Sequence, residues 1–212
     1  MNQFKQLHDG GQLLRLPNAW DAGSARLFES LGAPAIATTS AGVAWAAGYA
    51  DGGRMPVDVA IGVAASIARV LTVPLSVDFE NGYADDADTV ARHVMRLVDA
   101  GVAGINLEDG HDAPQALAAK IAAIKALAAQ AGKDIFINTR TDVYLKALAP
   151  DGERVAEVLR RADLYRAAGA DGLFVPGMVK PDEIAQVVTA AGLPVNVMDW
   201  PGVPDAAALV QL

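Results

Sequence analysis

PLSVDFENGY (74–83), GINLEDG (104–110) and DIFINTRTD (134–142) decide the fold, because each stretch ends an apolar run with polar residues two positions apart. Residues i and i+2 of a β-strand point to the same side, so each stretch presents a set of polar side chains on one side. The sets are Asp78 with Glu80, Asn106 with Glu108, and Asn138 and Arg140 with Asp142. If the three strands are neighbours in a parallel sheet, we expect the sets to face one centre.

Short apolar runs and helical segments alternate along the chain, as in a repeated β/α unit. Most runs are almost continuously hydrophobic, which is typical of parallel strands covered on both faces. The runs that predict strands are 13–17, 34–39, 73–78, 103–107, 134–138, 171–176 and 194–198. The segments that predict helices are 22–31, 57–70, 86–100, 114–131, 153–168, 182–191 and 204–212. This alternation predicts an α/β fold of the (β/α)8 TIM-barrel type, with residues 1–212 as a single barrel domain.

The repeat is one unit short of a (β/α)8 barrel. Seven strands are predicted, and the final residues VPDAAALVQL (203–212) read as the start of a helix. We therefore expect the barrel to be truncated at its carboxyl end, with its eighth β/α unit missing. A doubly wound open sheet is the alternative, but RLPNAWDAGSA (15–25) stands where its G-x-G-x-x-G fingerprint would be.

The composition argues against several classes of protein. The 212 residues are 52% hydrophobic and carry a net charge of −8 with a pI of about 4.8, which disfavours nucleic-acid partners. The absence of cysteine excludes disulfides, thiolate zinc sites and a cysteine catalyst. The amino-terminal residues lack the apolar segment of a signal peptide, and no apolar stretch approaches the length of a membrane span. We expect a cytoplasmic protein that binds neither membranes nor nucleic acids.

Asp78, Glu80 and Glu108 form the candidate metal site. Three carboxylates gathered around one guanidinium, that of Arg140, repel one another unless a further cation joins them. None of the three histidines lies in the strand ends, so the available ligands are carboxylate oxygens and water, which suit Mg²⁺ or Mn²⁺ better than zinc. The alternative is a structural role, in which these acids make buried hydrogen bonds and ion pairs.

Arg140 is the candidate contact for an anionic substrate, because its planar guanidinium matches a carboxylate or a phosphonate. The alternative is an internal pair with Asp142 or Glu108, and both arrangements can hold at once. We therefore expect a small carboxylate as the binding partner.

Loop residues complete the candidate site. The segment 38–53 leaves the second predicted strand through small residues, so that backbone N–H groups near Ser40, Ala41 and Gly42 can approach an anionic oxygen. His111, in the loop after Glu108, is a candidate acid or base.

Five motifs resemble those of the isocitrate lyase/phosphoenolpyruvate mutase superfamily, in the family's order and over nearly the whole chain. They are LPNAWDAGSARLFESLG (16–32), TTSAGVA (38–44), SVDFENGY (76–83), GINLEDG (104–110) and INTRTDVY (137–144). The resemblance implies a (β/α)8 barrel that forms a homo-oligomer, a dimer or tetramer with an exchanged C-terminal helix. It also implies Mg²⁺-dependent cleavage or formation of C–C or P–C bonds in 2-oxo or 2-hydroxy acids through enolate-like intermediates.

The resemblance also implies a role for individual residues. It makes Asp78, Glu80 and Glu108 the metal-site acids, and Asp51 the aspartate beside the metal's water and the substrate. It makes the backbone of Ser40, Ala41 and Gly42 an oxyanion cradle. It gives Arg140, Asn196 and Trp20 contacts with the substrate, although Trp20 can equally be a packing residue at the barrel mouth.

The chain departs from the superfamily after the fourth predicted strand. The lyases of the superfamily carry a loop there whose cysteine is the acid, and this chain instead has EDGHDAPQALAAKIAA (108–123). An isocitrate or methylisocitrate lyase is therefore disfavoured. The mutases carry lysine and asparagine in the same loop, where this shorter loop offers only His111, Asp112 and Gln115. A phosphonate mutase is disfavoured as well.

These observations favour a Mg²⁺-dependent, lyase-like enzyme that cleaves a C–C bond in a small 2-oxo or 2-hydroxy acid such as oxaloacetate, by decarboxylation, retro-aldol cleavage or hydrolysis. One alternative is a phosphonopyruvate-type P–C mutase or hydrolase. The other is a barrel that binds a carboxylate without catalysis, although a pure binder has little need for three clustered carboxylates.

Overall fold

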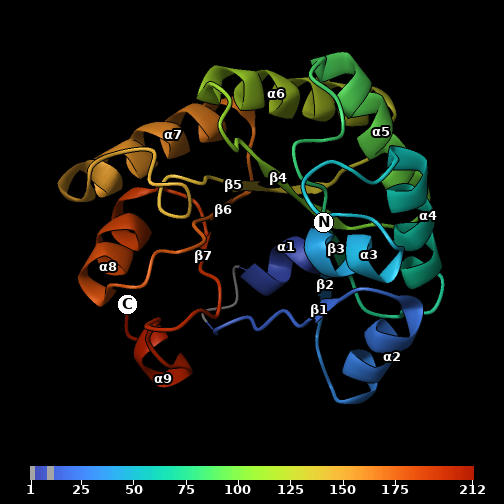
Figure 1. Ribbon diagram of the computed structural model, residues 1–212, viewed down its shortest axis with the longest axis horizontal. Coiled ribbons are helices and arrows are strands. Elements are labelled where there is room, and N and C mark those ends of the chain that lie inside the picture. Colours follow the sequence, from blue (N-terminus) through green and yellow to red (C-terminus); the bar gives the residue numbers. More distant parts are fainter. Residues whose placement is uncertain (1–2, 9–11) are drawn as a thin grey trace.

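Seven parallel strands form one curved sheet in the computed structural model, which describes residues 3–8 and 12–212. Each strand pairs with the next one along the chain, in the order β1-β2-β3-β4-β5-β6-β7. The strands are β1 (Asn18–Ala19), β2 (Ile36–Thr38), β3 (Leu75–Asp78), β4 (Gly104–Glu108), β5 (Phe136–Arg140), β6 (Gly172–Phe174) and β7 (Val195–Asn196). Figure 1 shows the strands curling around a centre, with most helices outside them. The fold is α/β, and the curled sheet is consistent with a partial TIM-type barrel.

Helices carry the chain from most strands to the next. They are α1 (Gln3–His8), α2 (Ala22–Ser30), α3 (Ser40–Ala46), α4 (Val57–Ala68), α5 (Ala87–Asp99), α6 (Pro114–Gln130), α7 (Arg154–Ala168), α8 (Pro181–Ala190) and α9 (Ala206–Leu209), with a 3-10 turn η1 (Asp151–Glu153). Within the described ranges, no helix is both long and apolar enough to cross a membrane.

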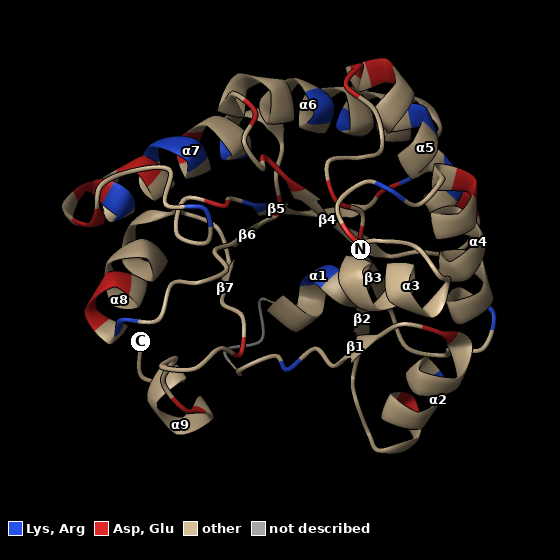
Figure 2. Cartoon of the chain, viewed as in Figure 1, with Lys and Arg blue, Asp and Glu red and all other residues tan. Residues whose placement is uncertain are grey.

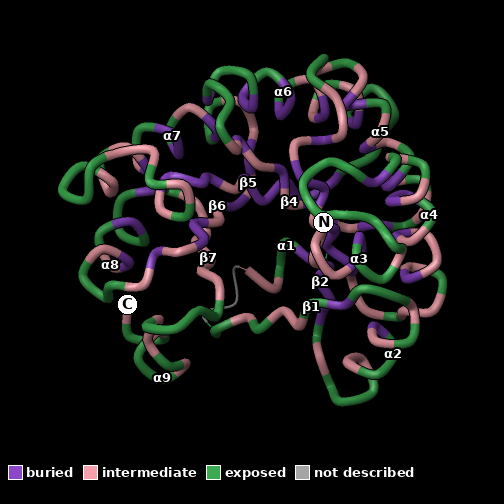
Figure 3. The backbone as a smooth tube through the Cα atoms, in the orientation of Figure 1, coloured by how far each residue is buried: buried purple, intermediate pink, exposed green. Residues whose placement is uncertain are grey.

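The helix α5 illustrates why these segments fold as they do. Asp86 caps its first turn by accepting a hydrogen bond from the backbone N–H of Thr89 at 2.8 Å. Its buried residues Val90, Val94 and Leu97 recur at helical spacing and pack in the core. Figure 3 shows the resulting pattern, in which most residues of β2 to β6 are buried and the outer surfaces of the helices are largely exposed.

The short helix α1 packs against the amino-terminal ends of the strands. The ring of Phe4 lies 5.3 Å from that of Phe136, at the start of β5. It also lies against Gly104, the first residue of β4, where a Cβ atom would come within 2.7 Å of the Phe4 ring. Since α1 covers this end of the sheet, the carboxyl ends of the strands are left for a site. The sequence-based prediction did not include α1.

The seven predicted strands are confirmed except for the position of the first. Residues 13–17 are not a strand; β1 begins at Asn18, directly after Pro17, whose carbonyl accepts the N–H of Ala37. Proline has no N–H to donate to a neighbouring strand, so the strand begins only at the residue after it.

The segment 38–53 also differs from its prediction. Ser40–Ala46 forms the helix α3, with Thr39 in an extended conformation before it, and this helix was not among the predicted ones. Alanine has the highest helix propensity, so the small residues of this segment form a helix.

Neither β1 nor β7 has a second partner strand among the described residues, since β1 pairs with β2 and β7 with β6. The missing eighth β/α unit stays a prediction.

Candidate active site

The strand register places polar residues of β3, β4 and β5 side by side. Asp78 is opposite Asn106, Asn106 is opposite Asn138, and Glu108 is opposite Arg140. The Nδ2 atom of Asn138 donates to the Oδ1 atoms of Asn106 and Asn196, each at 2.8 Å. These asparagines link β4, β5 and β7. On β4 and β5 they lie two residues before Glu108 and Arg140, which end those strands.

Arg140 is held between two carboxylates. Its Nη1 atom lies 2.9 Å from Glu108 Oε2, and its Nε atom donates to Asp142 Oδ1 at 2.7 Å. The centre of its guanidinium also lies 5.9 Å from the ring centroid of Phe174. Figure 2 shows acidic and basic segments next to each other near β4 and β5. Both internal pairs that the sequence offered as alternatives for Arg140 are therefore present.

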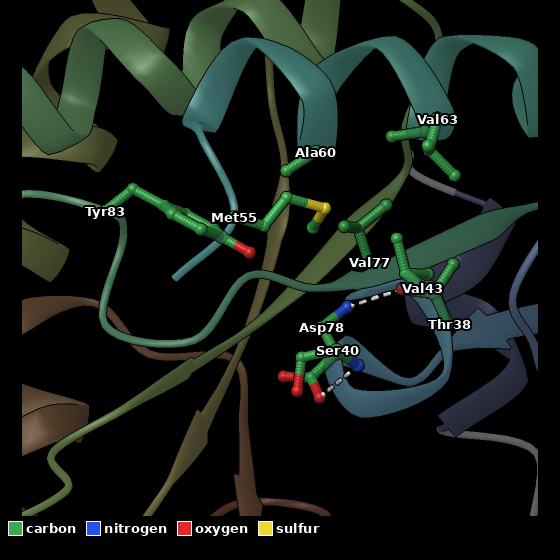
Figure 4. Close-up of a pocket in the computed structure, with 10 residues that line it drawn as sticks. Thr38, Ser40, Val43, Met55, Ala60, Val63, Val77, Asp78 and Tyr83 are labelled. Carbon is green, nitrogen blue, oxygen red and sulfur yellow. Dashed lines mark hydrogen bonds between the residues drawn. The ribbon is translucent and has the colours of Figure 1, made fainter. Parts of the chain in front are cut away.

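Asp78 ends β3 with one carboxylate oxygen held and the other without a partner. Ser40 N–H donates to Asp78 Oδ2 at 3.0 Å, and Asp78 N–H donates to Thr38 Oγ1 at 2.9 Å (Figure 4). Asp78 Oδ1 is buried and has no hydrogen-bond partner among the described residues. A cavity of about 10 Å³ beside it, lined mainly by apolar residues such as Met55 and Val77, has room for about one water molecule. Burying a charged carboxylate oxygen without a hydrogen-bond donor costs free energy, so we expect a partner from outside the chain, such as water or a cation, at this atom.

Glu80 lies beyond the end of β3, in a left-handed turn with φ 48°. The rule of alternating strand sides therefore does not apply to it, and the predicted set of Asp78 and Glu80 on one strand is wrong in that respect. The hydroxyl of Tyr83 donates to Glu80 Oε1 at 2.7 Å, and Glu80 is 6% exposed. The backbone N–H of Gly53 lowers the pKa of Glu80, whereas the nearby charge of Asp51 raises it. The loop after β2 thus meets the loop after β3.

The electrostatics of the site follow from its burial. The pKa of Glu108 is raised to about 7, mainly by burial and also by the nearby charge of Asp78, against the lowering effect of Arg140. Burial also raises the pKa of Glu80, although the Tyr83 hydroxyl opposes this. Both carboxyl groups are therefore harder to ionise than usual, and an added cation would favour their charged forms.

The acids partly fit a divalent metal. No group of three or more His, Asp or Glu side chains in the described part of the chain already has a metal-binding arrangement. Mg²⁺ commonly takes one or two carboxylates and completes its shell with water and substrate oxygens. Of the predicted metal-site acids, Asp78 has an unpartnered oxygen and Glu108 pairs with Arg140, so these two carboxylates are the candidates for such a site. Their hard oxygen atoms suit Mg²⁺ or Mn²⁺, whereas Glu80 is already engaged by Tyr83.

The other predicted residues lie around these groups. Ser40 donates its N–H to Asp78, so this N–H is not open to a substrate oxygen. Ala41 and Gly42 follow it in the first turn of α3. Trp20 is 43% exposed just after β1, and His111 is exposed in the turn after β4. Their roles stay predictions, as does a substrate contact of Asn196 beyond its bond to Asn138.

Asp109 was missed by the sequence-based prediction, yet its carboxylate connects the chain after β5 to the helix α7. Its Oδ1 accepts the backbone N–H of Asp142 at 3.0 Å. Its Oδ2 accepts hydrogen bonds from Arg161 Nη1 at 2.7 Å and from the Tyr165 hydroxyl at 2.6 Å. Asp109 is 1% exposed, so it anchors the chain after β5, and with it Arg140, to α7. Its position directly after Glu108 was the available signal, since successive residues alternate sides and a second acid there must face the helices.

Comparison with known proteins places this geometry in a family. A family model described as phosphoenolpyruvate phosphomutase matches residues 4–212. An uncharacterized protein of Mycobacterium tuberculosis is 40% identical over 203 residues, which cover 94% of this chain and 74% of that protein. The 2-methylisocitrate lyase of Escherichia coli is 30% identical over 205 residues, which cover 90% of this chain and 67% of the enzyme.

A solved structure gives the same result. A protein of Burkholderia cenocepacia J2315, provisionally described as a phosphonomutase, superposes with a TM-score of 0.93 at 43% identity, covering 98% of this chain and 87% of that one. The match of the family model over almost the whole chain agrees with the five motifs found in the sequence. The chain therefore belongs to the phosphoenolpyruvate phosphomutase family, within the isocitrate lyase/phosphoenolpyruvate mutase superfamily.

Proposed function

We propose that the protein is a Mg²⁺-dependent lyase that cleaves a C–C bond in a small 2-oxo or 2-hydroxy carboxylic acid. The observation that carries the proposal is the meeting of Asp78, Glu108 and Arg140 at the carboxyl ends of neighbouring strands, with one oxygen of Asp78 unpartnered. This end of the strands holds the active site in barrels of this type. The relationship to a 2-methylisocitrate lyase supports a lyase reaction.

Arg140 binds the carboxylate of the substrate in this proposal. Asp142 and Glu108 occupy its Nε and Nη1 atoms and fix the plane of the guanidinium. Its Nη2 atom has no partner among the residues that the structure describes, and an arginine N–H group is well suited to a carboxylate oxygen. The two internal carboxylates therefore orient Arg140 without using all of its donors.

Asp78 and Glu108 hold the metal. When bound there, Mg²⁺ would act as a Lewis acid: with a 2-oxo acid it would stabilise the negative charge that decarboxylation leaves on the 2-oxygen, and with a 2-hydroxy acid it would stabilise the 2-alkoxide formed when the hydroxyl proton is lost to solvent, before that alkoxide becomes the carbonyl of the released 2-oxo acid. Ser40 N–H orients Asp78, and Arg140 orients Glu108, so both carboxylates are positioned before the substrate arrives. Solvent donates the proton to the released carbon, because the mouth is open to water at the exposed residue His111.

A turnover screen tests this proposal. The purified chain is incubated with oxaloacetate, 2-methylisocitrate, 2,3-dimethylmalate and phosphonopyruvate, each with Mg²⁺, with Mn²⁺ and with a chelator. We expect metal-dependent cleavage of one of the three carbon acids. Turnover of phosphonopyruvate alone would instead identify the P–C chemistry suggested by the related Burkholderia protein, and the absence of turnover on all four would favour a binding barrel.

Arg140→Lys should mainly impair substrate binding. Lysine keeps the positive charge but has one donor nitrogen, so it cannot hold Glu108, Asp142 and a substrate carboxylate in one plane. We expect a rise in KM of at least roughly tenfold with a smaller fall in kcat, measured by steady-state kinetics on the substrate found in the screen. Arg69→Lys, at an exposed position at the end of α4, is the matched control and should leave both constants unchanged. An unchanged KM in Arg140→Lys would remove Arg140 from the substrate site.

A further inference from the structure

Lys146 lies in the turn after β5 and reaches back to the active site. Its Nζ atom is 2.8 Å from Asp142 Oδ2, while the other oxygen of the same carboxylate accepts from Arg140 Nε at 2.7 Å. A Cβ atom on Gly110, which follows β4, would lie 3.3 Å from Lys146 Nζ and 4.0 Å from Glu108 Oε1. The charge of Lys146 also lowers the pKa of Glu108. The ammonium group therefore lies between the loops after β4 and β5, beside Glu108.

Some donors of Lys146 are not used by the protein. Its Nζ atom pairs with Asp142 Oδ2 at 2.8 Å, which engages one of the three N–H groups of the ammonium. No other hydrogen bond from Lys146 Nζ is formed within residues 3–8 and 12–212, and its side chain is 28% exposed. The ammonium group is thus fixed at the mouth of the site by Asp142, while its remaining N–H groups are open to a ligand.

The charges around Lys146 indicate the kind of ligand that this site favours. Asp142 is fully buried and faces two cations, Arg140 and Lys146. Arg140 has a second carboxylate, Glu108, but Lys146 has no other ion-pair partner in the described part of the chain. Lys146 is therefore the less neutralised of the two cations. Because one carboxylate fixes both cations, their arrangement suits a ligand with two anionic groups.

We propose that Lys146 binds a second anionic group of the substrate, so that the site selects small acids with two carboxylates over acids with one. This deepens and rests on the proposed function, in which Arg140 binds the first carboxylate. Lys146 determines specificity here and takes no part in the bond cleavage.

Binding of two stable 2-hydroxy acids tests the role of Lys146 without requiring turnover. Malate and lactate differ by one carboxylate, and their dissociation constants are measured by calorimetry in the presence of Mg²⁺ for the wild type, Lys146→Met, Lys146→Arg and Lys133→Met. Methionine keeps most of the unbranched stem and removes the charge. Lys133 pairs with the exposed Asp99 at the surface, so Lys133→Met matches the charge change away from the mouth.

We expect the wild type to bind malate more tightly than lactate. Lys146→Met should weaken malate binding roughly ten- to hundred-fold, as for the loss of a hydrogen bond to a charged group, and should leave lactate binding unchanged. Lys146→Arg should recover most of the malate affinity, and Lys133→Met should behave as the wild type.

Other results would overturn the inference. Equal weakening of malate and lactate in Lys146→Met would show a general effect on the site, and unchanged malate binding would show no contact. A wild type that does not prefer malate, or binds neither acid, also contradicts it. The proposed function is judged separately: selective malate binding without turnover in the screen would refute the lyase and keep the role of Lys146, whereas turnover with unaffected malate binding in Lys146→Met would do the reverse.

Discussion

Asp78→Asn is expected to lower kcat roughly thirty- to thousand-fold, which corresponds to about 2–4 kcal/mol of lost transition-state stabilisation. The substitution keeps the size of the side chain and one oxygen that can accept the Ser40 N–H. It removes the negative charge from the group whose other oxygen is buried without a partner. We expect KM to change less than kcat, because Arg140 rather than Asp78 binds the substrate carboxylate.

Steady-state kinetics at saturating Mg²⁺, on the acid that the screen identifies, measure this effect. Asp163→Asn is the matched control, because Asp163 is exposed on α7 and pairs only with Arg166 at the surface. The melting temperature of Asp78→Asn should stay close to that of the control, which separates loss of activity from loss of fold. Equal kcat values in the two variants would make Asp78 a structural residue.

Asp109→Ala is expected to destabilise the protein by about 3–5 kcal/mol, the range found when one partner of a buried ion pair is removed. The substitution deletes the acceptor of three hydrogen bonds and leaves the buried guanidinium of Arg161 with Glu157 as its remaining partner. The buried hydroxyl of Tyr165 also loses its acceptor. Asp109→Asn keeps the shape and an acceptor oxygen, so it should cost less.

Urea unfolding at neutral pH measures these changes. Asp99→Ala is the control, because Asp99 is exposed and pairs with Lys133 at the surface, where an ion pair contributes about 0–1 kcal/mol. If Asp109→Ala unfolds at the same urea concentration as Asp99→Ala, the link between α7 and the chain after β5 does not stabilise the fold.

The strands and the main acids could be predicted from sequence because their signals are local. The apolar runs before Asp78, Glu108 and Arg140 give buried parallel strands, and in-register pairing then brings the strand ends together. The pair of Glu108 with Arg140 follows directly, since the two residues are opposite each other in neighbouring strands.

Other features depend on contacts that no local pattern reveals. The turn at Glu80 requires a positive φ, which the alternation of apolar and polar residues in 74–83 does not indicate. The helix α1 is positioned by Phe4 against Phe136, more than a hundred residues away. Lys146 reads as an ordinary surface lysine in the sequence, and only the fold brings it to the loop after Glu108.

Titration of the protein with Mg²⁺ tests the central claim most directly, namely that the acids at the strand ends form a metal-dependent site. Calorimetry is performed on the wild type, on Glu108→Gln and on Glu153→Gln, which makes the same change at an exposed position in η1. We predict that Mg²⁺ binds the wild type and Glu153→Gln alike, and binds Glu108→Gln at least roughly tenfold more weakly. Equal Mg²⁺ affinity in Glu108→Gln and the wild type, or no binding to the wild type, would contradict the claim.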